Sequence, residues 1–195
     1  MASANKSNPK SSVRAEKSLQ TRLRSWIQAR KKALKFIFFF LIFIVLFYIL
    51  WPSSLFNDSL NPAIENMYAF LSSKLLNLFG QQTIATGDSV SSVFFSIKIN
   101  RGCDAIEAMA LFASALLAFP AAWKRKLSGL CAGLFFLFAM NLLRIVSLFL
   151  IGRYAPDSFE FFHVEVWQIV FILFALGAWL FWAKSQLNHS KHADQ

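Results

Sequence analysis

The sequence predicts an all-α integral membrane protein with about four transmembrane helices and both termini in the cytoplasm. Hydrophobic residues make up 56% of the 195 residues, and the mean hydropathy of +0.49 exceeds that of ordinary soluble domains. Several apolar segments approach the roughly 20 residues that a helix needs to cross a bilayer. The net charge is +10, but the basic residues gather in a few segments. We therefore expect membrane lipid around the protein and no nucleic-acid partner.

Cysteine and histidine are too sparse for the usual metal or redox sites. The chain has two cysteines, Cys103 and Cys131, and three histidines, without a CxxC pair or a His-rich run. Two cysteines do not make a disulfide framework. We expect no metal and no cofactor.

Residues 1–32 are predicted to form a basic cytoplasmic tail. Residues 1–18 contain almost no large apolar side chains, so we expect them to be disordered. From Leu19 onward, apolar residues recur at helical spacing and Arg and Lys fill the other face. This pattern favours a basic amphipathic helix on an anionic bilayer surface. A solvated charged linker is the alternative.

Residues 33–51 are predicted to be the first transmembrane helix. The run 36–50 is apolar without interruption, and its flanks extend it to the length of a span. A cleaved signal peptide is the competing interpretation. The long basic segment before the run, and the lack of a small-residue cleavage site at 51–55, favour an uncleaved anchor.

Residues 52–102 are predicted to be an extracytoplasmic segment of roughly 50 residues. Asn61-Pro62 is a helix start and Gly80 a helix stop. The helix between them is predicted to lie on the bilayer or over the site with one apolar stripe, which consists of Ile64, Met67, Tyr68, Leu71, Leu75 and Leu78. Residues 92–99 alternate with a period of two after the turn pair Gly87-Asp88, which predicts a short β-hairpin leading to Cys103.

Residues 103–183 are predicted to be a membrane core with three further spans, followed by a cytoplasmic tail at 184–195. The expected spans are 105–122, 127–151 and 164–183. Ten Lys and Arg residues lie between the N-terminus and Lys35, three in the turn at 123–127 and two in the C-terminal tail, against four on the other side. The positive-inside rule therefore places both termini in the cytoplasm.

This topology brings three reactive side chains to one face. Cys103 opens the second span and His163 the fourth, so both lie at the outer membrane surface. Arg144 lies seven residues from the outer end of the third span, about 10 Å below that surface. A helix N-terminus and a cation favour a thiolate, an imidazole can move its proton, and an arginine can stabilise an oxyanion or hold a carboxylate. We predict a catalytic pocket formed by these three residues.

Each of these residues taken alone also has a purely structural interpretation. A cysteine at a helix start is often a small buried residue, and a lone arginine can form an ion pair or snorkel. Glu107 is a candidate partner for Arg144, with Asn141 one turn away as a supporting donor. Glu165 and Gln168 either orient His163 or line the helix interface. Cys131 is expected to be packing.

The residues resemble the exosortase/archaeosortase family of membrane cysteine transpeptidases. The resemblance covers roughly residues 85–183 and rests on the Cys103-Asp104-Ala105-Ile106-Glu107 run, on Asn141 and Arg144, and on His163 before the last helix. It is strongest for the short exosortase H type. Many family members carry Gly where this chain has Ala105, and many have about eight spans.

The resemblance implies catalytic roles for Cys103, Arg144 and His163. It also implies substrates that are exported proteins with a C-terminal signal made of a short motif, a transmembrane helix and a basic end. For the short type the implied motif is similar to Ile-Pro-Thr-Leu. The site would face the periplasm from the bacterial inner membrane. Two alternatives remain open: a non-enzymatic membrane assembly or anchoring protein, and a thiol-dependent lipid acyltransferase.

Overall fold

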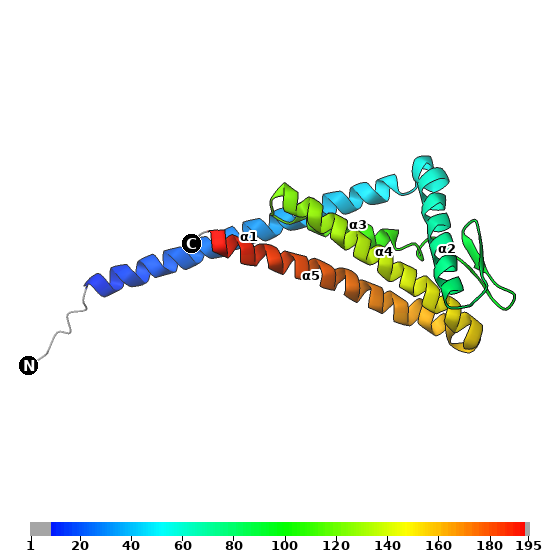
Figure 1. Ribbon diagram of the computed structural model, residues 1–195. Helices are drawn as coiled ribbons and strands as arrows, with labels where there is room; N and C mark the ends of the chain where they lie inside the picture. The colour runs from blue at the N-terminus through cyan, green and yellow to red at the C-terminus, as the bar shows by residue number, and fades with distance from the viewer. Residues whose placement is uncertain (1–8, 194–195) are drawn as a thin grey trace, which may run out of the picture.

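The computed structural model describes residues 9–193 and is mostly helical (Figure 1). The long elements are α1 (Pro9–Leu50), α2 (Asn61–Leu78), α3 (Ile106–Ala118), α4 (Trp123–Tyr154) and α5 (Trp167–Ala193). Three strands lie between α2 and α3, namely β1 (Ile84–Thr86), β2 (Ser89–Ser91) and β3 (Ser96–Lys98). Short turns of π- or 3₁₀-helix are η1 (Leu55–Leu60), η2 (Pro156–Ser158) and η3 (Phe161–Val166).

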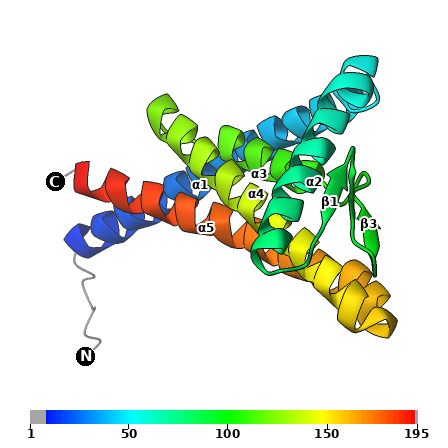
Figure 2. The same ribbon diagram turned by 45° about the vertical axis from the view of Figure 1, so that its right-hand side comes forward.

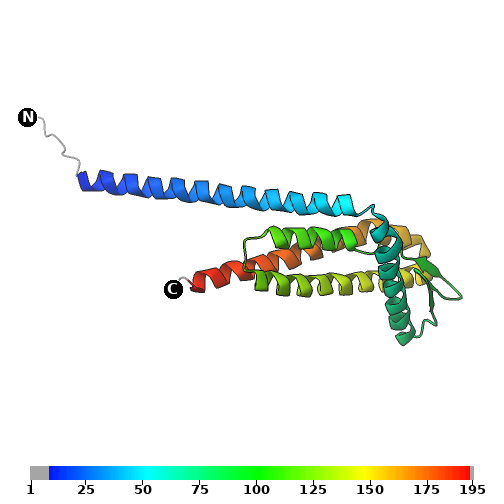
Figure 3. The ribbon, with the colours of Figure 1, turned by 90° about the horizontal axis from the view of Figure 1, so that it is seen from above.

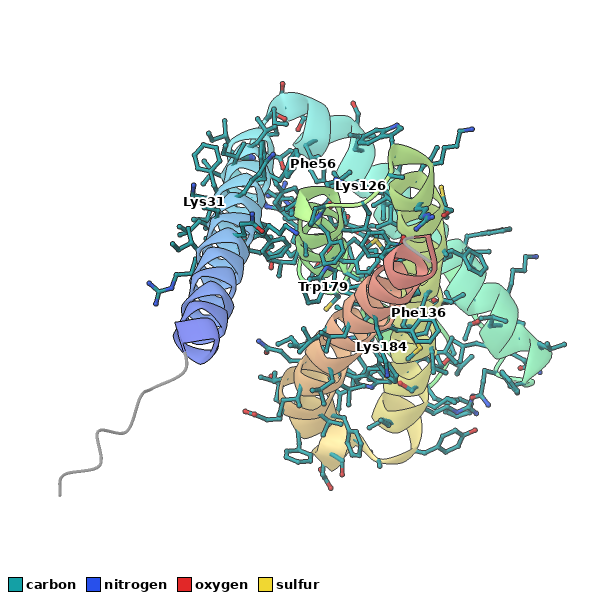
Figure 4. The ribbon with its side chains drawn as sticks, turned by 90° about the vertical axis from the view of Figure 1, so that its left-hand side faces the viewer. Lys31, Phe56, Lys126, Phe136, Trp179 and Lys184 are labelled. Carbon is teal, nitrogen blue, oxygen red and sulfur yellow. The ribbon has the colours of Figure 1, made fainter. Side chains whose placement is uncertain are left out.

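Four helices run lengthwise and the fifth crosses one end of them. α1 packs against α3, and α3 packs against α4 and α5. α2 and the sheet lie together at the end far from both termini (Figures 1 and 2). From above, α1 runs along one side and α2 crosses the far end (Figure 3). The view from the opposite end shows basic side chains on three helices, Lys31 of α1, Lys126 of α4 and Lys184 of α5 (Figure 4).

Among the residues that the structure describes, three helical segments are long and apolar enough to cross a membrane: Arg30–Leu50, Trp123–Tyr154 and Pro156–Gln186. They correspond to the first, third and fourth predicted spans. The second predicted span, 105–122, contains only the 13 residues of α3, which extend about 20 Å against a hydrocarbon core of about 30 Å. Pro120 accounts for this early end, because it forces the preceding Phe119 into an extended conformation (φ −69°, ψ 137°).

The first helix begins earlier than the sequence led us to expect. α1 runs continuously from Pro9, so residues 9–18, for which disorder was predicted, continue the membrane helix, while residues 1–8 lie outside the described residues. The segment 10–50 contains neither Gly nor Pro. Because each residue added to an existing helix gains a hydrogen bond without a new nucleation cost, the apolar span extends into the tail.

α2 has the predicted ends, but its predicted apolar stripe is only partly buried: Tyr68 lies in the core, and Ile64 and Leu75 pack against it. The helix begins at Asn61 and stops before Gly80, whose φ is +72°. Its buried residues are Asn61, Glu65, Tyr68, Ala69, Ser72, Ser73 and Leu76. Met67 and Leu78 of the predicted stripe are 43% and 79% exposed. The buried side also carries small polar residues, which hydrogen-bond to the segment that enters the sheet, as between Ser73 Oγ and Thr83 O at 3.1 Å. Apolar side chains on the outer side of α2 are compatible with contact with a bilayer, because lipid tails are as apolar as these side chains.

The predicted hairpin is a three-stranded antiparallel sheet in the order β1-β2-β3. Gly87, with φ +60°, and Asp88 form the predicted tight turn between β1 and β2. A second turn at Ser92 separates β2 from β3, and there the amide of Phe95 donates to Ser92 Oγ at 3.2 Å. Val93 and Phe94 therefore lie in a turn rather than in the predicted strand.

Phe95 anchors β3 to the end of α4. Its ring centroid lies 5.6 Å from that of Phe149 and 5.7 Å from that of Phe159. The ring occupies the space above Gly152 where a Cβ atom would stand. Arg153, the next residue of α4, lies over the Phe94 ring at 4.6 Å and donates to Gln81 Oε1 at 2.6 Å. The sheet is thus fixed to α4 by ring packing and hydrogen bonds.

Replacing Gly152 with Ala should displace Phe95 and destabilise the fold. Overpacking of this kind costs about 1–3 kcal/mol, and the midpoint of thermal unfolding in detergent should fall by roughly 2–12 °C. Gly177→Ala is the matched control, because nothing lies within 4 Å of a Cβ atom at that helical position. Its midpoint should stay equal or rise. Equal unfolding midpoints for the two variants would contradict the close packing of the Phe95 ring above Gly152.

Candidate active site

Cys103 lies in a tight turn just before α3. Its amide donates to Asn100 O at 2.9 Å, and Gly102 has φ +85°. Ala105, the N-cap residue of α3, is also left-handed, with φ +60° and ψ 8°. A non-glycine residue pays about 1–2 kcal/mol in this region. A glycine would adopt this conformation without that cost, so Ala105 holds the turn at the expense of local strain.

The structure brings His163 to the thiol. The Sγ atom of Cys103 lies 3.1 Å from Nε2 of His163, which is part of η3 before α5. Phe159 stacks on the imidazole with ring centroids 5.5 Å apart. Glu165 and Gln168 are exposed, and neither hydrogen-bonds to the imidazole in the described structure. The interpretation in which they orient His163 is therefore not supported.

Arg144 reaches the same turn from the middle of α4. The side chain is 8% exposed, and its Nη1 donates to the carbonyl oxygen of Gly102 at 3.4 Å. Its Nε has no hydrogen-bond partner among the described residues. Glu107 is exposed and no ion pair joins it to Arg144, both of which the structure describes, so the expected pairing is not formed. The guanidinium is buried without an ion-pair partner of that kind.

Asn141 holds the carbonyl of the cysteine itself. Its Nδ2 donates to Cys103 O at 2.9 Å, and the side chain is completely buried. Asn141 and Arg144 lie three residues apart on one face of α4, so their side chains can donate hydrogen bonds to the neighbouring carbonyl oxygens of Cys103 and Gly102. The buried hydroxyl of Tyr68 lies beside the Asn141 side chain. Neither this hydroxyl nor Asn141 Oδ1 has a hydrogen bond of normal geometry to another described residue.

Asp104 is a buried residue that we did not assign to the site from the sequence. It is 0% exposed and its Oδ1 accepts a hydrogen bond from the amide of Ile106 at 3.1 Å, at the start of α3. Its Oδ2 has no partner among the described residues. Burial raises the pKa of this carboxyl, and the nearby Glu107 raises it further, against backbone hydrogen bonds that lower it. An Asp just before a helix was a capping signal that could have identified it.

A cavity of about 320 Å³ opens beside these groups. Cys103, Arg144 and His163 all line it. Residues 95–99 of the β3 region form a further wall, and the remaining lining residues are Ile145, Leu148 and Phe159. A substrate in this cavity would meet a thiol, an imidazole and a guanidinium on one side and a strand on the other.

The resting thiol favours its protonated form. Burial raises the pKa of Cys103, and the carboxylate of Asp104 raises it further, whereas Arg144 and the amide hydrogen bond at Asn100 lower it. The sequence led us to expect that a helix N-terminus and a cation would favour the thiolate. The difference arises because desolvation is the largest effect and because Cys103 precedes α3 by three residues. His163 is the titratable side chain within hydrogen-bond distance of this thiol.

Cys131 lies on the outer surface of α4, in the half of the helix that begins at Trp123, and its side chain is exposed rather than packed. It does not line the cavity that contains Cys103.

Fold and site together describe a helical membrane protein in which a thiol–imidazole contact and a buried guanidinium line one cavity. The family model that matches the chain, over residues 25–182, is that of transmembrane exosortases. The chain therefore belongs to the transmembrane exosortase family. Membership indicates a transpeptidase-like role in the processing of exported proteins. Searches of curated proteins and of solved structures gave no match.

The rate of Cys103 alkylation by iodoacetamide should follow the raised pKa of its thiol. In a Cys131→Ser background, we expect the rate to rise with pH around a midpoint above that of an exposed cysteine. Asp104→Asn removes a negative charge that opposes the thiolate, so the midpoint should move to lower pH. Glu107→Gln, at an exposed acid on the same helix start, is the control and should move it less. A midpoint that rises in Asp104→Asn would contradict the assigned charge effect.

Proposed function

We propose that the chain is a membrane-embedded cysteine transpeptidase that cleaves the C-terminal sorting signals of exported proteins. The observation that carries this proposal is the 3.1 Å contact between Cys103 Sγ and His163 Nε2 at the wall of a cavity that Arg144 also lines. The family supplies the broader class, and the contact supplies a chemistry that fits it.

In the proposed reaction the Cys103 sulfur attacks the carbonyl carbon of a substrate amide while its proton moves to His163 Nε2. The tetrahedral oxyanion is stabilised by Arg144, which lines the cavity beside Cys103. The imidazolium then protonates the departing amine, the C–N bond breaks and a thioester remains. An acceptor amine or water, deprotonated by His163, attacks the thioester and releases the product together with the thiol.

The proposed topology has four membrane crossings, with both termini in the cytoplasm and the site at the periplasmic face of the inner membrane. The two termini lie at the same end of the molecule, and Cys103 lies in the turn that follows the sheet at the other end. The basic residues seen from the termini's end suit the cytoplasmic leaflet. For α3 to complete a crossing, the extended residues 119–122 must contribute. The proposed signal is a short motif, similar to Ile-Pro-Thr-Leu, followed by a transmembrane helix and a basic end.

Cys103→Ser should abolish processing while leaving insertion and folding nearly unchanged, because the two side chains are close in size. The measurement is the C-terminal mass of exported, membrane-anchored proteins from cells that contain either the wild type or the variant. Loss of trimmed C-termini is expected. Cys131→Ser is the matched thiol control and should be silent. Intact trimming in Cys103→Ser would favour the non-enzymatic assembly role, and a fatty acyl group on a trapped thioester would favour lipid acyl transfer.

Arg144→Lys should lower the rate of thioester formation by roughly 10²–10³-fold, the range seen when one oxyanion donor is lost. The ammonium keeps the charge but cannot supply the guanidinium fork. The rate is read by quench and mass analysis of the thioester in a single turnover. Arg125→Lys, at an exposed position near the start of α4, is the control. Full activity in Arg144→Lys would mean that charge alone is sufficient.

A further inference from the structure

β3 has one edge that is not paired to another strand of the described sheet. The strand order is β1-β2-β3, with Val90 opposite Ile97. Residues 95 and 99 point their main-chain groups toward β2, since Phe95 O accepts from Ser92 N at 2.8 Å and Ile99 N donates to Asp88 O at 2.9 Å. Because main-chain groups alternate along an antiparallel strand, those of Ser96 and Lys98 point to the other side.

The side chains of these two residues leave that edge uncovered. Ser96 Oγ bonds back to Ser91 Oγ of β2 at 2.7 Å, and Lys98 Nζ pairs with Asp88 at 3.4 Å. Both residues are exposed. The strand is nevertheless held firmly, because Phe95 packs against Phe149 and Phe159. The edge thus offers ordered main-chain donors and acceptors without blocking them.

The free edge borders the cavity that contains the thiol. Residues 95–99 line it together with Cys103, Arg144 and His163. Phe159 contacts both the ring of Phe95 and the imidazole of His163, so one aromatic side chain sets the spacing between the strand and the base. Whatever pairs with β3 would lie alongside Cys103.

We propose that the substrate binds as an extended peptide that adds a fourth strand to the free edge of β3. This inference rests on the proposed function. Strand addition gives affinity through the main chain and specificity through alternate side chains. A segment that leaves a transmembrane helix has unpaired main-chain groups, which are costly beside lipid and which β3 would satisfy. The apolar lining from Phe95, Ile145 and Leu148 suits an apolar side chain at one of the alternate positions.

The first test varies the peptide and uses the wild-type enzyme in detergent. The probe is a synthetic peptide copied from the residues around the cleavage site that C-terminal mass analysis identifies, with one amide N-methylated at a time. A strand uses alternate amides, so KM should rise about two- to tenfold at every second non-proline position and little between them. Equal effects at neighbouring positions, or none, would overturn strand addition.

The second test varies the edge. Lys98→Pro removes an N–H that points away from β2, and proline is tolerated on edge strands. We expect KM to rise about two- to tenfold, with kcat and the iodoacetamide rate of Cys103 close to the wild type. Lys98→Ala keeps the N–H, so its KM should rise clearly less than that of Lys98→Pro. Equal KM in the two variants would overturn the proposal.

The outcomes distinguish failure of the docking mode from failure of the function. If the unmodified peptide is not cleaved in a Cys103-dependent way, the proposed function itself is overturned. If it is cleaved but the methyl scan has no period of two, only strand addition is overturned. A change of oligomeric state in Lys98→Pro with cleavage intact would assign the edge to a second copy of the chain and also overturn the proposal.

Discussion

The site depends on two hydrogen bonds from α4 to the turn that carries the thiol. Asn141 holds Cys103 O at 2.9 Å, and Arg144 holds Gly102 O at 3.4 Å. The turn contains left-handed residues on both sides of the cysteine, and for Ala105 that conformation persists only when its surroundings impose it. A rigid helix provides that constraint, and it also fixes the guanidinium beside the cavity. One element therefore positions both the thiol and the cation.

The convergence of Cys103, Arg144 and His163 could be predicted from the sequence because chain order and charge distribution fix the depth of each residue. The burial of Asp104 and the exposure of Glu107 could not be predicted in this way. The left-handed Ala105 rotates the start of α3, so Asp104 is buried and Glu107, three residues later, is exposed. The hydrophobic stripe of α2 predicted only part of its buried face, since a bilayer also accepts apolar side chains such as Met67 and Leu78 on the outside. The turn that takes Val93 and Phe94 out of the strand depends on Ser92, a local hydrogen bond that alternation does not reveal.

Several buried polar atoms around the thiol have no partner among the described residues. They are Asp104 Oδ2, Arg144 Nε and Asn141 Oδ1. Each unsatisfied group in a buried environment costs about 1–3 kcal/mol, and more when it is charged. These atoms come from two elements and surround one turn, next to a cavity that a substrate can enter.

In the proposed enzyme, the balance between burial and charge sets the protonation state of the Cys103 thiol before substrate binds. With burial and Asp104 raising the pKa of Cys103, the thiol keeps its proton until His163 accepts it during the attack. The rate then depends on the geometry of the sulfur–imidazole contact more than on a preformed thiolate. A stacked phenyl ring, Phe159, holds the position of the imidazole, and no carboxylate among the described residues hydrogen-bonds to it. A ring held by packing takes up a proton without gaining an ion-pair partner, so the developing imidazolium is available to pass that proton to the leaving amine.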